Sequence, residues 1–386
     1  MRVYLHLRMP VRRGDVKMNS CYLMMTNRCN MNCSYCYERK FFRGNLKDIS
    51  EETAKQAVDF LVASHKPGNK ARPNEDINIC YFGGEPTLNW EVLKKNIVYV
   101  RSIEKEKKLK FGLYLLTNAK ELPKDEKEFF GVLRDNGVKM QVSLDGCKEA
   151  HDSTRGHFDV IVKNTRKIIE NLNRHIIVRM TVTPANIRHA YSSFRAMAEL
   201  SCTVNMVPIV EEEWTSDAIA IAKEEFKKIM NYYQKLSRIK PVKFNVAENC
   251  IDGGFRHCQT GASMVSITVD GIVYPCHRFQ FHPQPEKNWK MGDVFKGVER
   301  YPNFNGIFAK CYSCETNICH PCPSAFILKN SGRAPDYYCK WNKEIEELVR
   351  PQASEVRSYN EKEVYTKKLD LILEGLGEIQ KCVKKS

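Results

Sequence analysis

Six short apolar runs alternate with amphipathic helical patterns over the first 240 residues, and this alternation restricts the fold more than any other feature. The strand-like runs lie at residues 21–26, 76–82, 111–117, 139–143, 176–182 and 203–210. The helical patterns lie near residues 50–66, 89–104, 125–136, 159–172, 186–199 and 217–236. Strands that are each followed by a helix form a parallel sheet with right-handed crossovers. Six units are too few for a closed eight-unit barrel, so we predict an α/β fold with a partial (β/α)6 TIM-like barrel.

The character of the sequence changes near residue 240. Residues 250–340 are rich in Cys, Pro, Gly and Asn and have little helical periodicity, which is typical of a loop-dominated domain stapled by metal. Helical periodicity returns near residue 341. We therefore predict an N-terminal extension, the partial barrel, a C-terminal cysteine-rich loop domain and a helical tail. Their expected ranges are 1–20, 21–240, 241–345 and 346–386.

Composition restricts the partners and the compartment of the chain. The 61 Lys and Arg residues exceed the 46 Asp and Glu residues, and the resulting net charge of +15 suits an acidic partner. No basic array is interleaved with aromatic residues, so nucleic acid is not expected. The chain lacks an apolar run of about 20 residues and a secretory signal, so we expect a cytoplasmic protein without a membrane partner. In that compartment, 16 cysteines favour metal binding over disulfides.

Three cysteines follow the first predicted strand, in the sequence TNRCNMNCSYCYE. Cys29, Cys33 and Cys36 have the spacing Cys-x3-Cys-x2-Cys, and three thiolates in one short loop can hold one face of a [4Fe–4S] cube. Three ligands leave the fourth iron open to a small molecule, whereas a structural site normally closes its shell. The alternative is a zinc knuckle whose fourth ligand lies elsewhere, although zinc sites more often pair their cysteines as CxxC.

This triad resembles that of the radical S-adenosylmethionine (SAM) superfamily, in which an aromatic residue, here Tyr35, commonly precedes the third cysteine. The resemblance implies that the open iron chelates the amino and carboxylate groups of SAM. It also implies that one electron cleaves SAM to methionine and a 5′-deoxyadenosyl radical, which abstracts hydrogen from a substrate. The electron is expected from a reducing partner such as flavodoxin or ferredoxin.

Residues at the end of the second predicted strand extend this SAM site. In the sequence YFGGEP, Gly83 and Gly84 allow the backbone to approach a ligand closely, and Glu85 supplies a carboxylate suited to an ammonium group. The segment resembles the superfamily's GGEP segment, which contacts the amino group of SAM. The alternative is an ordinary turn between a strand and a helix.

The next two strands end in further candidate SAM contacts. Asn118 ends the third strand, and Ser143 ends the fourth, where contacts to ribose or carboxylate are expected. The following SLDG…HD…RG run, which includes Arg155, resembles that of radical SAM enzymes with an extra cluster-binding domain. The alternative is a turn at Asp145 with a surface ion pair between Asp152 and Arg155.

A second group of cysteines lies in the loop-dominated region. Its members are Cys258, Cys276, Cys311, Cys314, Cys319, Cys322 and Cys339. With a Gly-x4-Cys element at Cys276, the group resembles the SPASM domain of a radical SAM subfamily, which holds two auxiliary [4Fe–4S] clusters. The later cysteines are spaced Cys-x2-Cys-x4-Cys-x2-Cys, whereas the subfamily usually has gaps of two, five and three residues. The alternative is a zinc ribbon built from CxxC pairs.

The SPASM resemblance assigns the cysteines to two clusters. It implies an outer cluster with four ligands, at Cys311, Cys314, Cys319 and Cys339. It implies an inner cluster with three, at Cys258, Cys276 and Cys322. The inner cluster then keeps an open iron or takes Cys250 as its fourth ligand.

The resemblance also implies the type of reaction. SPASM enzymes mostly act on peptides or proteins, so we expect an oxidoreductase that oxidatively modifies a peptide, through a thioether or carbon–carbon crosslink of a ribosomal peptide. The alternative is an anaerobic sulfatase maturase that forms formylglycine. His277 stands where those maturases carry an aspartate, so it is a candidate catalytic base, or it packs beside a cluster. An alternative of another class is a non-catalytic iron–sulfur or zinc protein for electron transfer or scaffolding.

Overall fold

A computed structural model describes the chain between residues 18 and 360, with gaps. The described residues are 18–38, 46–66, 70–172, 176–200, 203–238, 242–252, 258–302, 304, 307, 311, 314–330 and 332–360. Most of the predicted N-terminal extension and the end of the predicted tail lie outside them. The chain divides into two compact units. The first holds residues 1–142, 163–172 and 259–305, and the second holds residues 143–162, 173–258 and 306–386. The predicted domain boundaries stay predictions.

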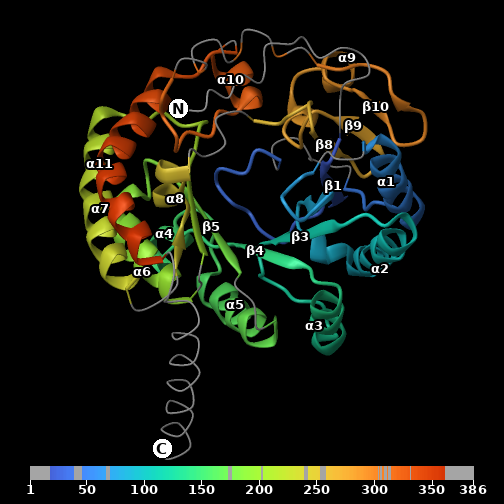
Figure 1. Cartoon of the computed structure of the whole chain (residues 1–386), viewed down its shortest axis with the longest axis horizontal. Coiled ribbons are helices and arrows are strands. Elements are labelled where there is room, and N and C mark those ends of the chain that lie inside the picture. The colour runs from blue at the N-terminus through green and yellow to red at the C-terminus, as the bar shows by residue number, and fades with distance from the viewer. Residues whose placement is uncertain are drawn as a thin grey trace, which may run out of the picture. The chain divides into compact units, whose positions relative to one another are not determined.

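The first unit is built on parallel strands that follow one another in sequence order (Figure 1). They are β1 (Ser20–Thr26), β2 (Ile77–Gly83), β3 (Phe111–Thr117) and β4 (Lys139–Ser143). Strand β1 begins its pairing with Ser20 opposite Asn78, and β2 begins with Ile77 opposite Phe111. Nearly every residue of β3 is buried, as expected for a parallel strand that is covered on both faces.

Helices separate these strands along the chain. They are α1 (Glu51–Ser64), α2 (Trp90–Lys107) and α3 (Glu126–Asp135). After β4 the chain forms the short helix α4 (Lys148–Asp152) and then α5 (Phe158–Leu172). Ser50 is the N-cap of α1, because its hydroxyl accepts a hydrogen bond from the backbone N–H of Thr53. The apolar face of α1 is buried at Ala54, Val58 and Leu61.

Part of the cysteine-rich region contributes short strands to the sheet of the first unit. They are β8 (Met264–Ile267), β9 (Ile272–Tyr274), β10 (Gly292–Asp293) and β11 (Gly297–Val298), with the short helix α9 (Pro285–Asn288) between β9 and β10. Strand β8 pairs in parallel with β1, and β9 pairs antiparallel with β8. The loop-rich region thus contains short strands that the sequence did not predict, because strands this short show no periodicity in sequence.

The second unit repeats the strand–helix alternation. Its strands are β5 (Ile177–Val182), β6 (Thr203–Pro208) and β7 (Lys243–Phe244). Its helices are α6 (Ala190–Leu200), α7 (Ser216–Leu236), α8 (Asn245–Asp252), α10 (Pro323–Asn330) and α11 (Asp336–Asn360). Helices α7 and α11 pack along each other, and Trp341 contacts Trp214 and Phe226 with ring centroids 5.4 and 5.8 Å away (Figure 1).

The predicted α/β class is confirmed. All six predicted strands are present, each shifted by at most two residues at an end, and the strands that pair within each unit from β1 to β7 are parallel. Within the described part of the chain, no helix combines the length and apolar character that crossing a bilayer requires.

A buried amide connects three elements of the first unit. Asn96 on α2 accepts a hydrogen bond from the Tyr81 hydroxyl on β2 at 3.1 Å and donates one to the Ala54 carbonyl on α1 at 2.8 Å. We expect Asn96→Leu to lower the free energy of unfolding by about 1–3 kcal/mol, because the buried Tyr81 hydroxyl would lose its acceptor and the Ala54 carbonyl would lose its side-chain donor. Chemical denaturation measures the loss. The exposed Ser102→Ala on the same helix is the control, and equal stability of the two variants would contradict the prediction.

Candidate functional site

The three cysteines of the triad lie together in the loop that follows β1. Cys29 is solvent-exposed and Cys33 and Cys36 are half-buried, and the Cys36 N–H donates to the Cys33 carbonyl at 3.2 Å. Desolvation still raises the pKa of Cys29 to about 12, a hydrogen bond from the Met31 backbone opposes this, and the nearby groups of Glu85, Cys33 and Cys36 raise it further. Since metals bind the thiolate, cluster binding at this loop would release protons.

An arginine next to the triad fixes the loop to its surroundings. The Arg28 guanidinium contacts Asp48 through Nε at 2.9 Å and Nη2 at 2.6 Å, and Nη2 also donates to the Leu88 carbonyl at 2.9 Å. Asp48 accepts a further hydrogen bond from the Thr26 hydroxyl at 2.5 Å. Sequence reasoning missed this anchor; the only signal was the position of Arg28 directly before Cys29.

The glycine pair after β2 lies against the backbone of the triad loop. The Gly84 N–H donates to the Thr26 carbonyl at 3.0 Å, and the Glu85 N–H donates to the Arg28 carbonyl at 2.8 Å. A Cβ at Gly83 would lie 2.3 Å from the Thr26 carbonyl oxygen, and Gly83 also has a φ of +119°. A Cβ at Gly84 would lie 2.2 Å from the Arg28 carbonyl oxygen. These contacts require glycine at both positions because the triad loop itself occupies the space.

Glu85 is buried and its carboxylate connects the ends of β2 and β3. Its Oε1 accepts from the Thr87 N–H at 3.2 Å and from the hydroxyls of Thr87 and Thr117, both at 2.8 Å. Its Oε2 accepts from the Asn118 N–H at 2.7 Å. Burial raises the pKa of Glu85, and these hydrogen bonds oppose the rise. The carboxylate therefore has a structural role in addition to any contact with a ligand ammonium.

Asn118 brings an amide to the first cysteine. Its Nδ2 lies 3.8 Å from the Cys29 sulfur and donates to Asn30 Oδ1 at 3.0 Å. Lys120 reinforces the same place, since its Nζ donates to the Asn30 carbonyl at 2.8 Å. The structure thus assembles the triad, the glycine pair and the end of β3 at one edge of the sheet, the carboxyl edge where parallel α/β folds bind ligands.

His277 lies among aromatic rings of the first unit. Its ring centroid is 4.5 Å from that of Tyr22, 4.8 Å from Phe82 and 6.0 Å from Tyr37. The Arg278 guanidinium stacks over the Tyr37 ring at 4.6 Å. Tyr37 directly follows Cys36, and His277 directly follows Cys276, so these rings connect the triad loop to the segment of one predicted auxiliary ligand. Tyr35 is half-buried in the same loop.

Ser143 and Arg155 belong to the second unit, where Arg155 is buried against a carboxylate. Arg155 Nε donates to Asp145 Oδ2 at 2.9 Å, and the two side chains are 11% and 0% exposed. The Thr154 hydroxyl and the Thr181 N–H also donate to Asp145, at 3.1 and 2.9 Å. A buried charge requires such compensation. The alternative of a solvated surface pair for Arg155 is therefore wrong, and its role in SAM binding stays a prediction.

Five of the predicted auxiliary ligands pack against one apolar cluster of the second unit, which includes Phe326 and Tyr338. They are Cys258, Cys311, Cys319, Cys322 and Cys339. Burial raises the pKa of the Cys319 thiol well above its ordinary value, and the nearby thiols of Cys339, Cys311 and Cys314 raise it further. The four cysteines predicted for the outer cluster are therefore neighbours.

The other two candidate auxiliary cysteines are buried elsewhere. Cys276 is buried in the first unit, and Cys250 is buried on α8 of the second. Burial raises the pKa of Cys250 to about 12. Among the described residues, no three Cys, His, Asp or Glu side chains converge as they would on a single bound ion. The observation that suits the outer set to an iron–sulfur cluster is that its four thiols lie near one another.

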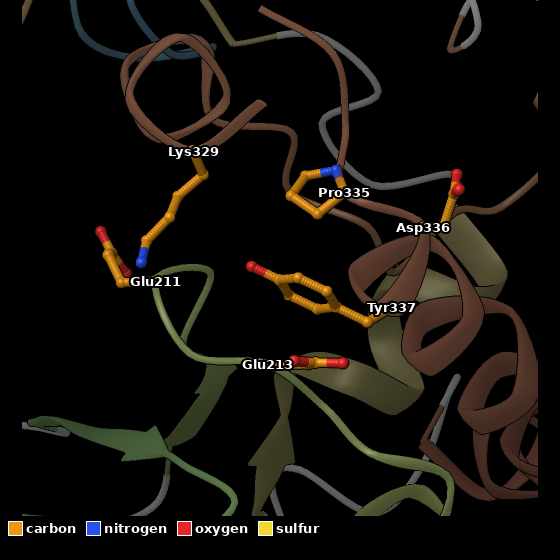
Figure 2. A pocket seen from close by; sticks show the side chains of 6 residues that line it. All are labelled: Glu211, Glu213, Lys329, Pro335, Asp336 and Tyr337. Atoms are coloured by element: carbon orange, nitrogen blue, oxygen red, sulfur yellow. The ribbon is translucent and has the colours of Figure 1, made fainter. Parts of the chain in front are cut away.

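Sequence reasoning missed a pocket of about 370 Å³ in the second unit (Figure 2). It is lined by Glu211, Glu213, Lys329, Pro335, Asp336 and Tyr337. The Tyr337 hydroxyl donates to the Val210 carbonyl at 2.8 Å, which fixes the loop after β6 to the start of α11. In Figure 2 the Lys329 side chain extends toward Glu211. The lining is acidic although the chain is basic, and the run of glutamates at 211–213 was its signal in the sequence.

Comparison with known proteins identifies the class. Residues 23–191 match the Radical SAM superfamily. The chain is 21% identical over 279 residues to radical SAM cyclopropyl synthase TigE of Paramaledivibacter caminithermalis, covering 66% of this chain and 56% of that protein. It is 28% identical over 272 residues to sporulation killing factor maturation protein SkfB of Bacillus subtilis, covering 67% and 60%. Native anSMEcpe with bound AdoMet and Cp18Cys peptide has a similar fold, with a TM-score of 0.69, 18% identity, and coverage of 88% and 98%.

The chain therefore carries a radical SAM domain, as its cysteine triad predicted. Proteins of this superfamily use a [4Fe–4S] cluster and SAM. The assignment of the cysteine-rich C-terminal region to a SPASM domain stays a prediction. The chain spans less than two thirds of the length of TigE and of SkfB.

The contact between Gly84 and the triad loop leads to a prediction about cluster loading. We expect Gly84→Ala to lower the iron content by about four atoms per chain after anaerobic reconstitution, because its Cβ would displace the backbone at Arg28 and Cys29. Iron and sulfide analysis measures the loss. Gly131→Ala is the control, since a Cβ there meets nothing within 4 Å and removes a flexible residue from α3. Full iron content in Gly84→Ala would refute the argument.

Proposed function

We propose that the protein is a radical SAM oxidoreductase that modifies a peptide. The observation that carries the proposal is the three-cysteine loop, which is held by the glycine pair and Glu85 beside Asn118. A site with three cysteine ligands keeps one iron open, and an electron carrier without catalysis has no need of an open iron. Cys29, Cys33 and Cys36 would hold the cluster, which with SAM would supply a 5′-deoxyadenosyl radical for hydrogen abstraction from the peptide.

The residues of this chain divide into three proposed roles. Cys29, Cys33 and Cys36 hold the SAM cluster. The proposed contacts to SAM are made by Tyr35, Gly83, Gly84, Glu85, Asn118, Ser143 and Arg155. The outer auxiliary cluster is held by Cys311, Cys314, Cys319 and Cys339, and the inner one by Cys258, Cys276 and Cys322. The neighbourhood of Cys319 supports the outer set, because its pKa responds to the other three thiols.

A peptide substrate is supported by the relatives. SkfB is named as a maturation protein for the sporulation killing factor, and anSMEcpe has been solved with a bound peptide. Hydrogen abstraction would remove one electron and one proton from the substrate, and the proposed auxiliary clusters would accept the second electron once a base has taken the second proton. We therefore propose a net two-electron oxidation such as a thioether or carbon–carbon crosslink. A protein reductant such as flavodoxin or ferredoxin would supply the electron for SAM cleavage.

SAM cleavage tests the class of the reaction. With dithionite, SAM and anaerobically reconstituted protein, we expect 5′-deoxyadenosine to form, and Cys29→Ala to reduce its formation to the background without enzyme. Chromatography with mass detection measures the product. The control is Cys147→Ala, because Cys147 is half-buried outside the proposed ligand sets. Fully loaded protein that forms no 5′-deoxyadenosine would support an electron-transfer or scaffolding protein.

His277 is the proposed base for loss of a substrate proton. We expect His277→Phe to keep the ring packing against Tyr22 and Phe82, to keep 5′-deoxyadenosine formation, and to slow peptide oxidation by at least about 10²-fold. The mass of a candidate precursor peptide reports the reaction, since a crosslink removes two hydrogen atoms, whereas formylglycine formation from cysteine also replaces the thiol sulfur by oxygen. Formylglycine formed from serine removes two hydrogen atoms as well, so a hydrazide that labels aldehydes distinguishes it from a crosslink. Unchanged peptide oxidation in His277→Phe would assign the histidine to packing alone.

A further inference from the structure

One face of α11 carries both a proposed cluster ligand and a buried carboxylate. Cys339 and Glu346 are seven residues apart, which is about two helical turns, so they project from the same side of the helix. Glu346 is 4% exposed, and Glu347 next to it faces solvent. A buried carboxylate at this position requires partners that compensate for the lost water.

The partners of Glu346 are backbone amides that directly precede another proposed ligand. Its Oε2 accepts hydrogen bonds from the N–H of Asn317 at 2.6 Å and from the N–H of Ile318 at 3.1 Å. Cys319 is the next residue. Asn317 is also held by its side chain, which donates to the Cys250 carbonyl at 3.4 Å. One carboxylate thus fixes the backbone that sets the direction of the Cys319 side chain.

Charge reinforces this arrangement. Hydrogen bonds from N–H groups to a carboxylate are stronger than those to a neutral acceptor, and Arg350, one turn further along α11, forms an ion pair with Glu346. A negative charge near an iron–sulfur cluster favours its oxidised state over the more negative reduced state.

We propose that Glu346 is a positioning residue for the outer auxiliary cluster. Its carboxylate holds the backbone that leads into Cys319 against the helix that carries Cys339. Its charge also lowers the reduction potential of that cluster. The inference rests on the proposed function for the identity of the cluster, and it adds a residue outside the cysteine motif to the machinery that binds it.

The experiment compares Glu346→Ala and Glu346→Gln with the surface control Glu347→Gln in the full-length, anaerobically reconstituted protein. The readouts are iron and sulfide per chain, amide hydrogen exchange in the segment 314–322, and the midpoint potential of each cluster from a redox titration followed by electron paramagnetic resonance. Formation of 5′-deoxyadenosine without peptide is measured in parallel, because it depends on the Cys29, Cys33 and Cys36 cluster and tests the proposed function separately.

We expect Glu346→Ala to lose about four iron atoms per chain and to exchange the amides of segment 314–322 faster. Glu346→Gln keeps an acceptor oxygen, so it should regain the iron but raise the potential of one auxiliary cluster, while Glu347→Gln matches the parent protein. Normal iron and amide protection in Glu346→Ala would overturn the inference. If Glu346→Ala does not fold, an unshifted potential and unchanged exchange in Glu346→Gln would overturn it instead. Missing 5′-deoxyadenosine in the parent protein would refute the proposed function alone.

Discussion

The close approach of two backbone segments, Gly83–Gly84 and Thr26–Cys29, is the constraint on which the candidate site depends. It brings the end of β2 against the loop that carries the first cysteine, at a separation that only glycine allows. Hydrogen bonds from the N–H groups of Gly84 and Glu85 then fix that loop in place. A three-cysteine loop gains its function from the direction of its thiols, and this contact sets the direction before any cluster binds.

In both units, a buried carboxylate accepts hydrogen bonds from backbone N–H groups of a distant segment. Glu85 accepts from the Asn118 N–H, Asp145 accepts from the Thr181 N–H, and Glu346 accepts from the Asn317 N–H. Each acid is almost fully buried and each fixes a segment far from it in sequence. Backbone N–H groups at the ends of strands and in ligand loops need partners, and an ionised acid can serve several of them at once.

The parallel strands and the cysteine triad could be predicted from the sequence, because both depend on patterns within a few residues. The run FGLYLLT and the observed β3 coincide, and the spacing of Cys29, Cys33 and Cys36 identified the superfamily that the comparison confirmed. The supports of the site were not predictable, because Arg28 with Asp48 and Glu346 with Asn317 are paired by the fold across about 20 or more residues. Arg155 shows the same limit, since the sequence does not reveal that it pairs with the buried Asp145 and not with Asp152.

The parallel pairing of β8 with β1 makes the part of the chain that carries the cysteine triad dependent on residues that come much later. Strand β1 leads directly into the cysteine loop, and one of its two edges is covered by Met264–Ile267. A protein shortened after residue 240 would expose that edge, and unpaired strand edges bind to one another. The radical SAM portion is therefore not a separable module, and a ribosome must release residues beyond β8 before the first strand of the sheet is complete.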